Sequence, residues 1–337
     1  MKKIFNLIAS FVLLAGFSAC NKDGSDKPGL PPAPVPTVNY KGLTFISSGN
    51  STVCLAKVGA PDEITLEYST DESQWNPYTI GEKISLADGT FLLFRAGEQK
   101  NLTFSKGSDS YYHFEISGPV TAQGNIMSLL DRDFSTPLST NAFFALFEGC
   151  KSLLSAPELP ATTMAQGCYF RMFAECTGLK SAPELPAEAL AYNCYGRMFK
   201  GCSALTYVPD LPATKMEAYC YNSMFANCTS LKFAPELPAT RLDTGCYHCM
   251  FEGCTSLTSA PELPATELVS NCYEFMYKDC RNLRYVIGLF TTEPSKKTTE
   301  DWLSGVAVSG TFIKSEKATW DVTGVHGIPE GWKIETW

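Results

Sequence analysis

Most of the fourteen cysteines in this sequence recur at a fixed interval of 26 residues and fall into two columns. Thiols repeated in this way could form a ladder of buried side chains, a series of disulfides, or metal sites. A metal is the least favoured, because structural zinc sites use spacings such as Cys-x2-Cys and no histidine follows the period. We therefore expect no metal and no cofactor. The first column consists of Cys150, Cys176, Cys202, Cys228, Cys254 and Cys280, and the second of Cys168, Cys194, Cys220, Cys246 and Cys272.

The spacing favours buried, reduced thiols over disulfides. Within one repeat, Cys194 and Cys202 are expected about 10 Å apart, beyond the roughly 7 Å between Cα atoms that a disulfide spans. Cysteines in successive repeats are closer, but parallel strands in register rarely direct their Cβ atoms at each other. If Cys20 carries a lipid, as proposed below, the number of cysteines left to pair is odd, so they cannot all form disulfides. Disulfides remain the alternative, because an exported protein permits them. Cys249 is out of phase with both columns, and we expect it to be exposed and reactive.

The remaining nucleophiles and bases do not form a recognisable catalytic site. His113, His248 and His326 lie in different parts of the chain, and no Gly-x-Ser-x-Gly, His-Glu-x-x-His or phosphate-loop motif is present. A pair of His248 with Cys246 or Cys249 is conceivable, but neighbours on one helix rarely have the geometry of a nucleophile and its base. Nothing indicates paired carboxylates for glycoside hydrolysis. We predict that the protein is not an enzyme, with a hydrolase as the weakest alternative.

Charged and aromatic positions on the period are candidates for binding. A column of acidic residues could bind a basic partner or a divalent cation. We favour a structural interpretation, in which the carboxylates face solvent or accept hydrogen bonds from loop N–H groups. Variable positions are better candidates, because aromatic residues and arginine are enriched at the centres of interfaces. The acidic column is Glu158, Glu184, Asp210, Glu236 and Glu262, and the candidate binding residues are Lys180, Tyr207, Lys232, Phe233, Arg284 and Tyr285.

The repeat that must position these residues is expected to span residues 123–290. In the copy at 211–237, Met216, Cys220 and Met224 recur every four residues, which predicts a short helix with one apolar stripe. Gly, Asn or Asp follows this stripe in five of six copies, and these residues tolerate the left-handed backbone that ends a helix. The stretch 231–237 is then extended. The sequence therefore predicts an α/β solenoid of leucine-rich-repeat type, with a short helix and a parallel strand in each repeat.

The repeat also resembles a known family. The motif Phe-x-x-Cys-x-x-Leu followed by a proline-containing strand, as in residues 250–257 and the stretch after them, is similar to the BspA-like leucine-rich repeats of bacterial surface lipoproteins. The resemblance covers about half of the chain. It implies a surface-anchored adhesin that binds extracellular or host proteins, and it transfers no set of ligand-binding residues.

The N-terminus predicts export and lipid anchoring. Residues 1–19 combine two lysines, a short apolar run and small residues before Cys20, which is the pattern of a lipoprotein signal peptide. Cys20 is then the lipidated first residue of the mature protein, with ordinary secretion as the alternative. The proline-rich stretch 20–39 is a tether. We expect the protein in the cell envelope, on the outer-membrane surface and facing outward. A net charge of −8 argues against nucleic acid as a partner.

Non-repetitive parts flank the solenoid. Residues 40–122 show short alternating runs separated by turn residues, which predicts a small all-β sandwich of immunoglobulin-like size. We place Trp75 in its core, with stacking on a glycan as the weaker alternative, and Cys54 is expected to be a buried free thiol. Residues 291–337 lose the period and are expected to cap the solenoid, with Trp302, Trp320, Trp332 and Trp337 packed beneath the cap.

Two functions follow as hypotheses. In the first, the solenoid binds an extracellular or host protein, because six parallel rows make a sheet about 25–30 Å wide, enough for an interface of about 800 Å² per partner. In the second, the β-sandwich and its aromatic residues bind a glycan.

Overall fold

The computed structural model describes residues 41–99 and 102–337. The predicted signal peptide at 1–19 and tether at 20–39, with the lipidation site Cys20, lie outside the described residues. Contacts join the described residues into a single unit.

The first part of this unit consists of two antiparallel sheets that pack face to face. Alternation of apolar and polar residues between turns produces the strands, as the sequence predicts. Phe45 of the first sheet meets Phe114 of the second at 5.0 Å between ring centroids. The strands are β1 (Leu43–Ser47), β2 (Ser51–Val58), β3 (Leu66–Ser69), β4 (Asn76–Tyr78), β5 (Ile84–Leu86), β6 (Phe91–Ala96), β7 (Ser105–Gly107), β8 (Ser110–Ser117) and β9 (Val120–Gln123). One sheet has the order β10-β9-β1-β6-β3-β4, in which β10 is Leu153–Ser155, and the other has the order β5-β2-β8-β7.

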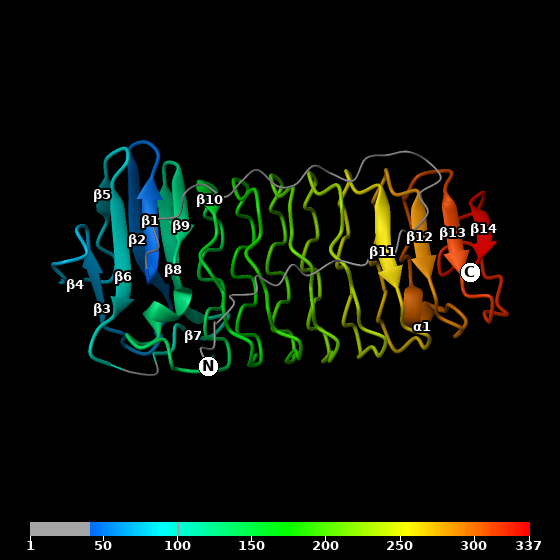
Figure 1. Ribbon diagram of the computed structural model, residues 1–337, viewed down its shortest axis with the longest axis horizontal. Helices are drawn as coiled ribbons and strands as arrows, with labels where there is room; N and C mark the ends of the chain where they lie inside the picture. Colours follow the sequence, from blue (N-terminus) through cyan, green and yellow to red (C-terminus); the bar gives the residue numbers. More distant parts are fainter. Residues whose placement is uncertain (1–40, 100–101) are drawn as a thin grey trace, which may run out of the picture. The chain divides into compact units, whose positions relative to one another are not determined.

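The solenoid grows directly from the edge of the first sheet. Strand β10 (Leu153–Ser155) pairs in parallel with β9, and Leu153 lies opposite Val120. In the core, the ring of Phe147 stacks on Phe114 at 5.1 Å. A short 3-10 helix, η1 (Ile126–Leu129), lies where the first coil begins. The coils follow directly on the sheets (Figure 1), and one cluster of buried apolar side chains runs through both.

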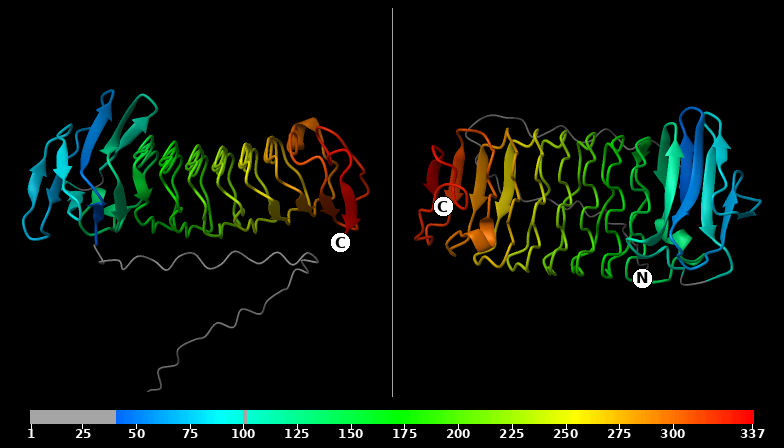
Figure 2. Two further views of the ribbon diagram at one scale, coloured as in Figure 1. Left: turned by 90° about the horizontal axis from the view of Figure 1, so that it is seen from above. Right: turned by 180° about the vertical axis from the view of Figure 1, so that it is seen from behind.

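The coils repeat every 26 residues and stack side by side along the long axis, as Figure 2 shows. We call residues 193–202, and the equivalent residues of the other coils, the turn segment. Along it, alternate N–H groups donate to the next coil: Tyr195 to the carbonyl of Cys220 and Arg197 to that of Asn222, at 3.0 and 2.7 Å. The N–H groups between them close local turns, such as Met198 to Tyr195 at 3.2 Å. Every coil is thus bonded to its neighbour through the backbone.

The helix predicted in each repeat does not form, and this part of the α/β prediction is wrong. Every fourth residue of the turn segment has a positive φ, for example Asn193 at 54°, Arg197 at 55° and Gly201 at 77°. A left-handed residue every four positions breaks an α-helix, yet it keeps the same residues facing inward as a helix would. The left-handed backbone predicted after the apolar stripe is correct, and even Glu175 adopts it, with φ of 61°.

The opposite side of each coil is extended, and here the prediction of parallel strands is confirmed. Strand β11 (Ser259–Leu263) pairs in parallel with β12 (Tyr285–Gly288). The other coils touch through isolated parallel bridges, such as Ser181 to Tyr207 and Phe233 to Ser259. Proline supplies no N–H group, so the proline pair in each repeat keeps the strands short. We call this side the strand face.

Two aromatic ladders fill the interior. Tyr195 stacks on Tyr221 at 5.8 Å with 7° between the ring planes, and Phe199 stacks on Phe225 at 5.7 Å and 4°. Identical side chains in consecutive coils therefore fall in register, which fixes how each coil lies on the next. The first ladder runs through Phe143, Tyr169, Tyr195, Tyr221, Tyr247 and Tyr273, and the second through Phe147, Phe173, Phe199, Phe225, Phe251 and Tyr277.

The coil geometry continues past residue 290, although the sequence repeat does not. Strand β12 pairs in parallel with β13 (Thr311–Lys314), and β13 with β14 (Lys333–Thr336). Helix α1 (Lys296–Thr299) lies near the start of this part of the chain. Residues 291–337 thus extend the stack and end it. Trp302, Trp320 and Trp332 are buried here as predicted, whereas Trp337 is 62% exposed.

Candidate functional site

The six candidate binding residues lie on the strand face of the solenoid. Lys180, Lys232 and Arg284 occupy one column in every second coil, and their side chains are exposed. Tyr207, Phe233 and Tyr285 occupy the adjacent column. Tyr207 and Phe233, in consecutive coils, are 42% and 44% exposed, and Tyr285 is half-buried. The structure therefore places a basic column beside an aromatic column.

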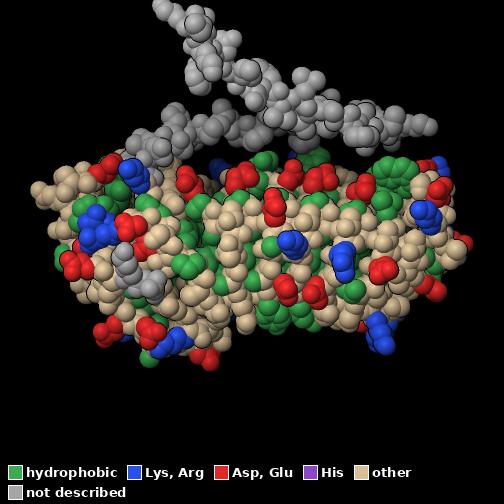
Figure 3. All heavy atoms as spheres, turned by 60° about the horizontal axis from the view of Figure 1, so that its bottom comes forward, with side chains coloured by type: hydrophobic (Ala, Val, Ile, Leu, Met, Phe, Trp, Pro, Cys, Tyr) green, Lys and Arg blue, Asp and Glu red, His purple; other side chains and the backbone are tan. Residues whose placement is uncertain are grey.

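The acidic column lies three residues further along the same strand face. Glu158, Glu184, Asp210 and Glu236 are exposed, and Glu262 is half-buried. Asp210 accepts a hydrogen bond from the backbone N–H of Glu236 at 3.2 Å, so in this coil the carboxylate satisfies a loop donor. Figure 3 shows acidic side chains following one another along the length of the coils.

Proline side chains flank the acidic column. An open hollow of about 370 Å³ lies between two coils at the start of the solenoid, lined by Pro157, Pro160, Pro183 and Pro186 together with the acidic residues Glu158 and Glu184. The strand face thus combines basic, aromatic, acidic and apolar columns in parallel.

The cysteine columns link successive coils. In the first column the thiol of Cys202 donates to the carbonyl of Phe173, and that of Cys228 to the carbonyl of Phe199, at 3.1 and 3.2 Å. Cys150 makes the same bond to Phe114 in the sheet region, at 3.0 Å. Cysteines 54 to 280 are all buried and form no disulfide in the described chain. No cluster of histidine, cysteine and carboxylate side chains in the described chain is arranged to hold a metal.

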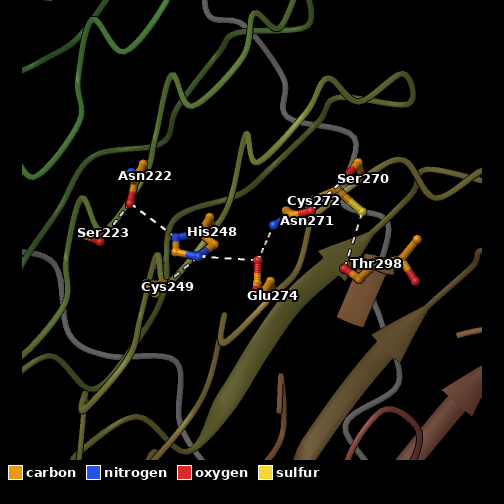
Figure 4. Close-up of polar contacts among 9 residues, drawn as sticks. All are labelled: Asn222, Ser223, His248, Cys249, Ser270, Asn271, Cys272, Glu274 and Thr298. Carbon is orange, nitrogen blue, oxygen red and sulfur yellow. Dashed lines mark hydrogen bonds and ion pairs between the residues drawn. The ribbon is translucent and has the colours of Figure 1, made fainter. Parts of the chain in front are cut away.

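A polar cluster on the turn segments surrounds His248 (Figure 4). Its Nε2 lies 3.4 Å from the Glu274 carboxylate and 3.9 Å from the Cys249 thiol, and its Nδ1 lies 3.4 Å from Asn222 Oδ1. Asn271 donates to the same Glu274 oxygen. A thiol, an imidazole and three further polar side chains are thus brought together from three consecutive coils.

Burial disfavours the charged forms of this thiol and imidazole. Burial, followed by the charge of Glu252, raises the pKa of Cys249 to about 12. Burial also lowers the pKa of His248, despite Glu274 and Glu252 nearby. A nucleophilic cysteine needs a depressed pKa and access to solvent. Cys249 is only 8% exposed, so the expectation of an exposed, reactive thiol is wrong. Its side chain lies against Glu252 of its own coil and Ser223 of the preceding coil.

Trp75 lies outside the sandwich core, which corrects the sequence prediction. Its side chain is half-buried and lines a second hollow of about 380 Å³. The guanidinium of Arg95 lies 3.7 Å from the centroid of the Trp75 ring. Arg132 and Phe134, from the loop after η1, line the same hollow. No motif in the sequence marks Arg132 or Phe134, because only the fold brings this loop beside β3 and β6.

Comparison with protein-family models, with curated proteins and with solved structures finds no match for this chain. Among the described residues, no helix has the length and apolarity needed to cross a membrane.

Proposed function

We propose that this protein is a BspA-like surface lipoprotein, anchored through Cys20, whose solenoid binds an extracellular or host protein through its strand face. The observation that carries the proposal is the pair Tyr207 and Phe233, which are 42% and 44% exposed in consecutive coils. Large apolar side chains exposed side by side are typical of interaction sites.

The charges around this pair support a protein as the partner. Lys180 and Lys232 flank the aromatic residues on one side, and the carboxylates of Asp210 and Glu236 lie on the other. A surface with both signs of charge around an aromatic centre suits a partner with a mixed surface, and the charged rim would govern orientation and association rate. The proposed role is recognition and adhesion at the outer surface of the cell envelope.

The test measures binding of residues 20–337 to a panel of purified extracellular-matrix proteins by surface plasmon resonance. For a panel member that binds, the double variant Tyr207→Ser, Phe233→Ser is expected to weaken the affinity by about tenfold or more, since buried aromatic anchors dominate interface energies. The matched control is Val308→Ser, which removes a side chain that is 92% exposed elsewhere on the unit. Equal affinities of the double variant and the unchanged protein would contradict the proposal.

A further inference from the structure

The hollow around Trp75 has the composition of a ligand site. It opens on the six-stranded sheet, next to β6, and has a volume of about 380 Å³. Its floor is the buried pair Leu93 and Phe94, and its walls carry two aromatic rings, Trp75 and Phe134. Three cationic side chains, Lys41, Arg95 and Arg132, line it as well. Pockets for small ligands combine apolar walls with a few placed polar groups in this way.

The charges in the hollow do not cancel. Arg95 Nε and Arg132 Nη2 both donate to the carboxylate of Glu67, at 2.8 and 2.7 Å. Glu72 is the one acidic residue of the lining itself, while Glu67 lies behind the two arginines, and Lys41 forms no ion pair with any described residue. Set against Glu67 and Glu72, the three cations Lys41, Arg95 and Arg132 leave one positive charge in excess, in a protein whose net charge is −8. A single carboxylate on a ligand would match it.

The arginines and the loop are held in place before any ligand arrives. Arg132 Nε donates to the carbonyl of Ala96 at 3.2 Å, in addition to its bond with Glu67. The loop that carries Arg132 and Phe134 folds around Asp131, which is 1% exposed and accepts the N–H groups of Asp133 and Ser135 at 2.7 and 3.2 Å. A site that is already ordered loses little conformational entropy on binding.

We infer that this hollow binds a sugar unit that carries a carboxylate, such as a hexuronic acid in an acidic glycan. The pyranose ring has an apolar face for Trp75 and Phe134, and its carboxylate would pair with Arg132 and Lys41. A plain inorganic anion would leave the aromatic walls without a function. The site lies apart from the strand face, so it does not depend on the proposed protein partner.

The experiment is isothermal titration calorimetry on residues 20–337 with three probes: oligomers of galacturonic and glucuronic acid, neutral glucose oligomers of equal length, and sulfate. Binding of an acidic oligomer, without binding of the neutral one, is the expected result. Lys41→Gln is expected to weaken it by about fivefold to tenfold, the worth of one charge-assisted hydrogen bond. Because Lys41 has no partner in the described chain, this variant should keep the fold.

Two further variants complete the design. Trp75→Leu is expected to weaken binding of the acidic oligomer about tenfold through loss of the aromatic surface. Lys57→Gln is the matched control, since Lys57 is exposed on β2 in the other sheet and should leave binding unchanged. Failure of every acidic oligomer to bind, equal binding of the neutral oligomer, or binding of sulfate with the same affinity would each overturn the inference. None of these outcomes bears on the strand face.

Discussion

At the scale of single residues, burial determines the chemistry of the repeated cysteines. Burial raises the pKa of Cys150, Cys220 and Cys254 to about 12, and the pKa of Cys228 is raised well above its usual value for the same reason. A thiol in such an environment is neutral and inert. The first column uses that neutral form, because only a protonated thiol can donate to the carbonyl of the preceding coil.

These pKa shifts predict a stability that falls with rising pH. Below the ordinary thiol pKa of about 8.5 the thiols are protonated in both states, so their contribution is fully present. Above it the unfolded chain loses protons that the folded chain keeps, and each such thiol lowers the free energy of unfolding by about 1.4 kcal/mol per pH unit until the folded pKa is reached. Urea unfolding at pH values between about 7 and 10 measures this slope.

The variant Cys254→Ser isolates one thiol. Serine can still donate to the carbonyl of Phe225, which accepts from Cys254 at 3.1 Å, but it does not ionise in this range. We expect its slope above about pH 9 to be smaller by about 1.4 kcal/mol per pH unit. The prediction fails if the two proteins lose stability in parallel.

At the scale of the element, the turn segment is an alternative to a helix that only stacking makes possible. Half of its N–H groups donate to the next coil, so an isolated repeat would leave them without partners. Its left-handed positions are strained for most residues and free of strain for glycine. The last left-handed position of each turn segment forms a column, in which Gly149 has φ 74° and Glu175 has φ 61°. A glycine and a non-glycine residue can therefore be compared at the same position of the repeat.

Substitutions in this column are expected to act in opposite directions. Gly149→Ala should lower the free energy of unfolding by about 1 kcal/mol through the backbone alone, because an added Cβ there meets no atom within 4 Å. Glu175→Gly should raise it by a few tenths up to about 1 kcal/mol, since the gain at φ exceeds the entropy cost of glycine. Denaturant unfolding of both variants provides the measurement. Changes of the same sign would show that φ is not the controlling variable.

At the scale of the whole molecule, the aromatic and thiol ladders require register between coils. Removal of one full period, residues 203–228, joins Cys202 to Thr229 and keeps every column aligned. We expect this shortened protein to fold and to unfold cooperatively at a lower temperature, because a solenoid's stability is a sum over repeats and their interfaces.

A deletion of half a period, residues 203–215, is the matched control. It places the turn segment of one coil against the strand of the next, so the Tyr195 and Phe199 ladders lose their partners. We expect it to give no folded protein, as judged by circular dichroism and size-exclusion chromatography. Equal behaviour of the two deletions would contradict an architecture that depends on register.

Much of the fold could be predicted from the sequence, because its signals are local or strictly periodic. Columns such as Cys202 and Leu205 establish stacked units, since no single repeat can bury its apolar side alone. Alternation of apolar and polar residues at 53–57 and 64–68 predicts β-strands there, and Gly201 and its equivalents predict left-handed backbone. The candidate residues Tyr207 and Phe233 follow from their variability on the period and are exposed on one face.

Only the tertiary structure decided whether the turn segment forms a helix or a series of turns. It also assembled the hollow around Trp75. An apolar stripe every four residues, such as Cys194, Met198 and Cys202, suits an α-helix and a segment with a left-handed residue every four positions equally well. The neighbouring coil selects the second, because it accepts the N–H groups that a helix would use internally. Trp75 and Arg132 lie far apart in sequence, so only the packing of the loop after η1 on the sheet could bring them together.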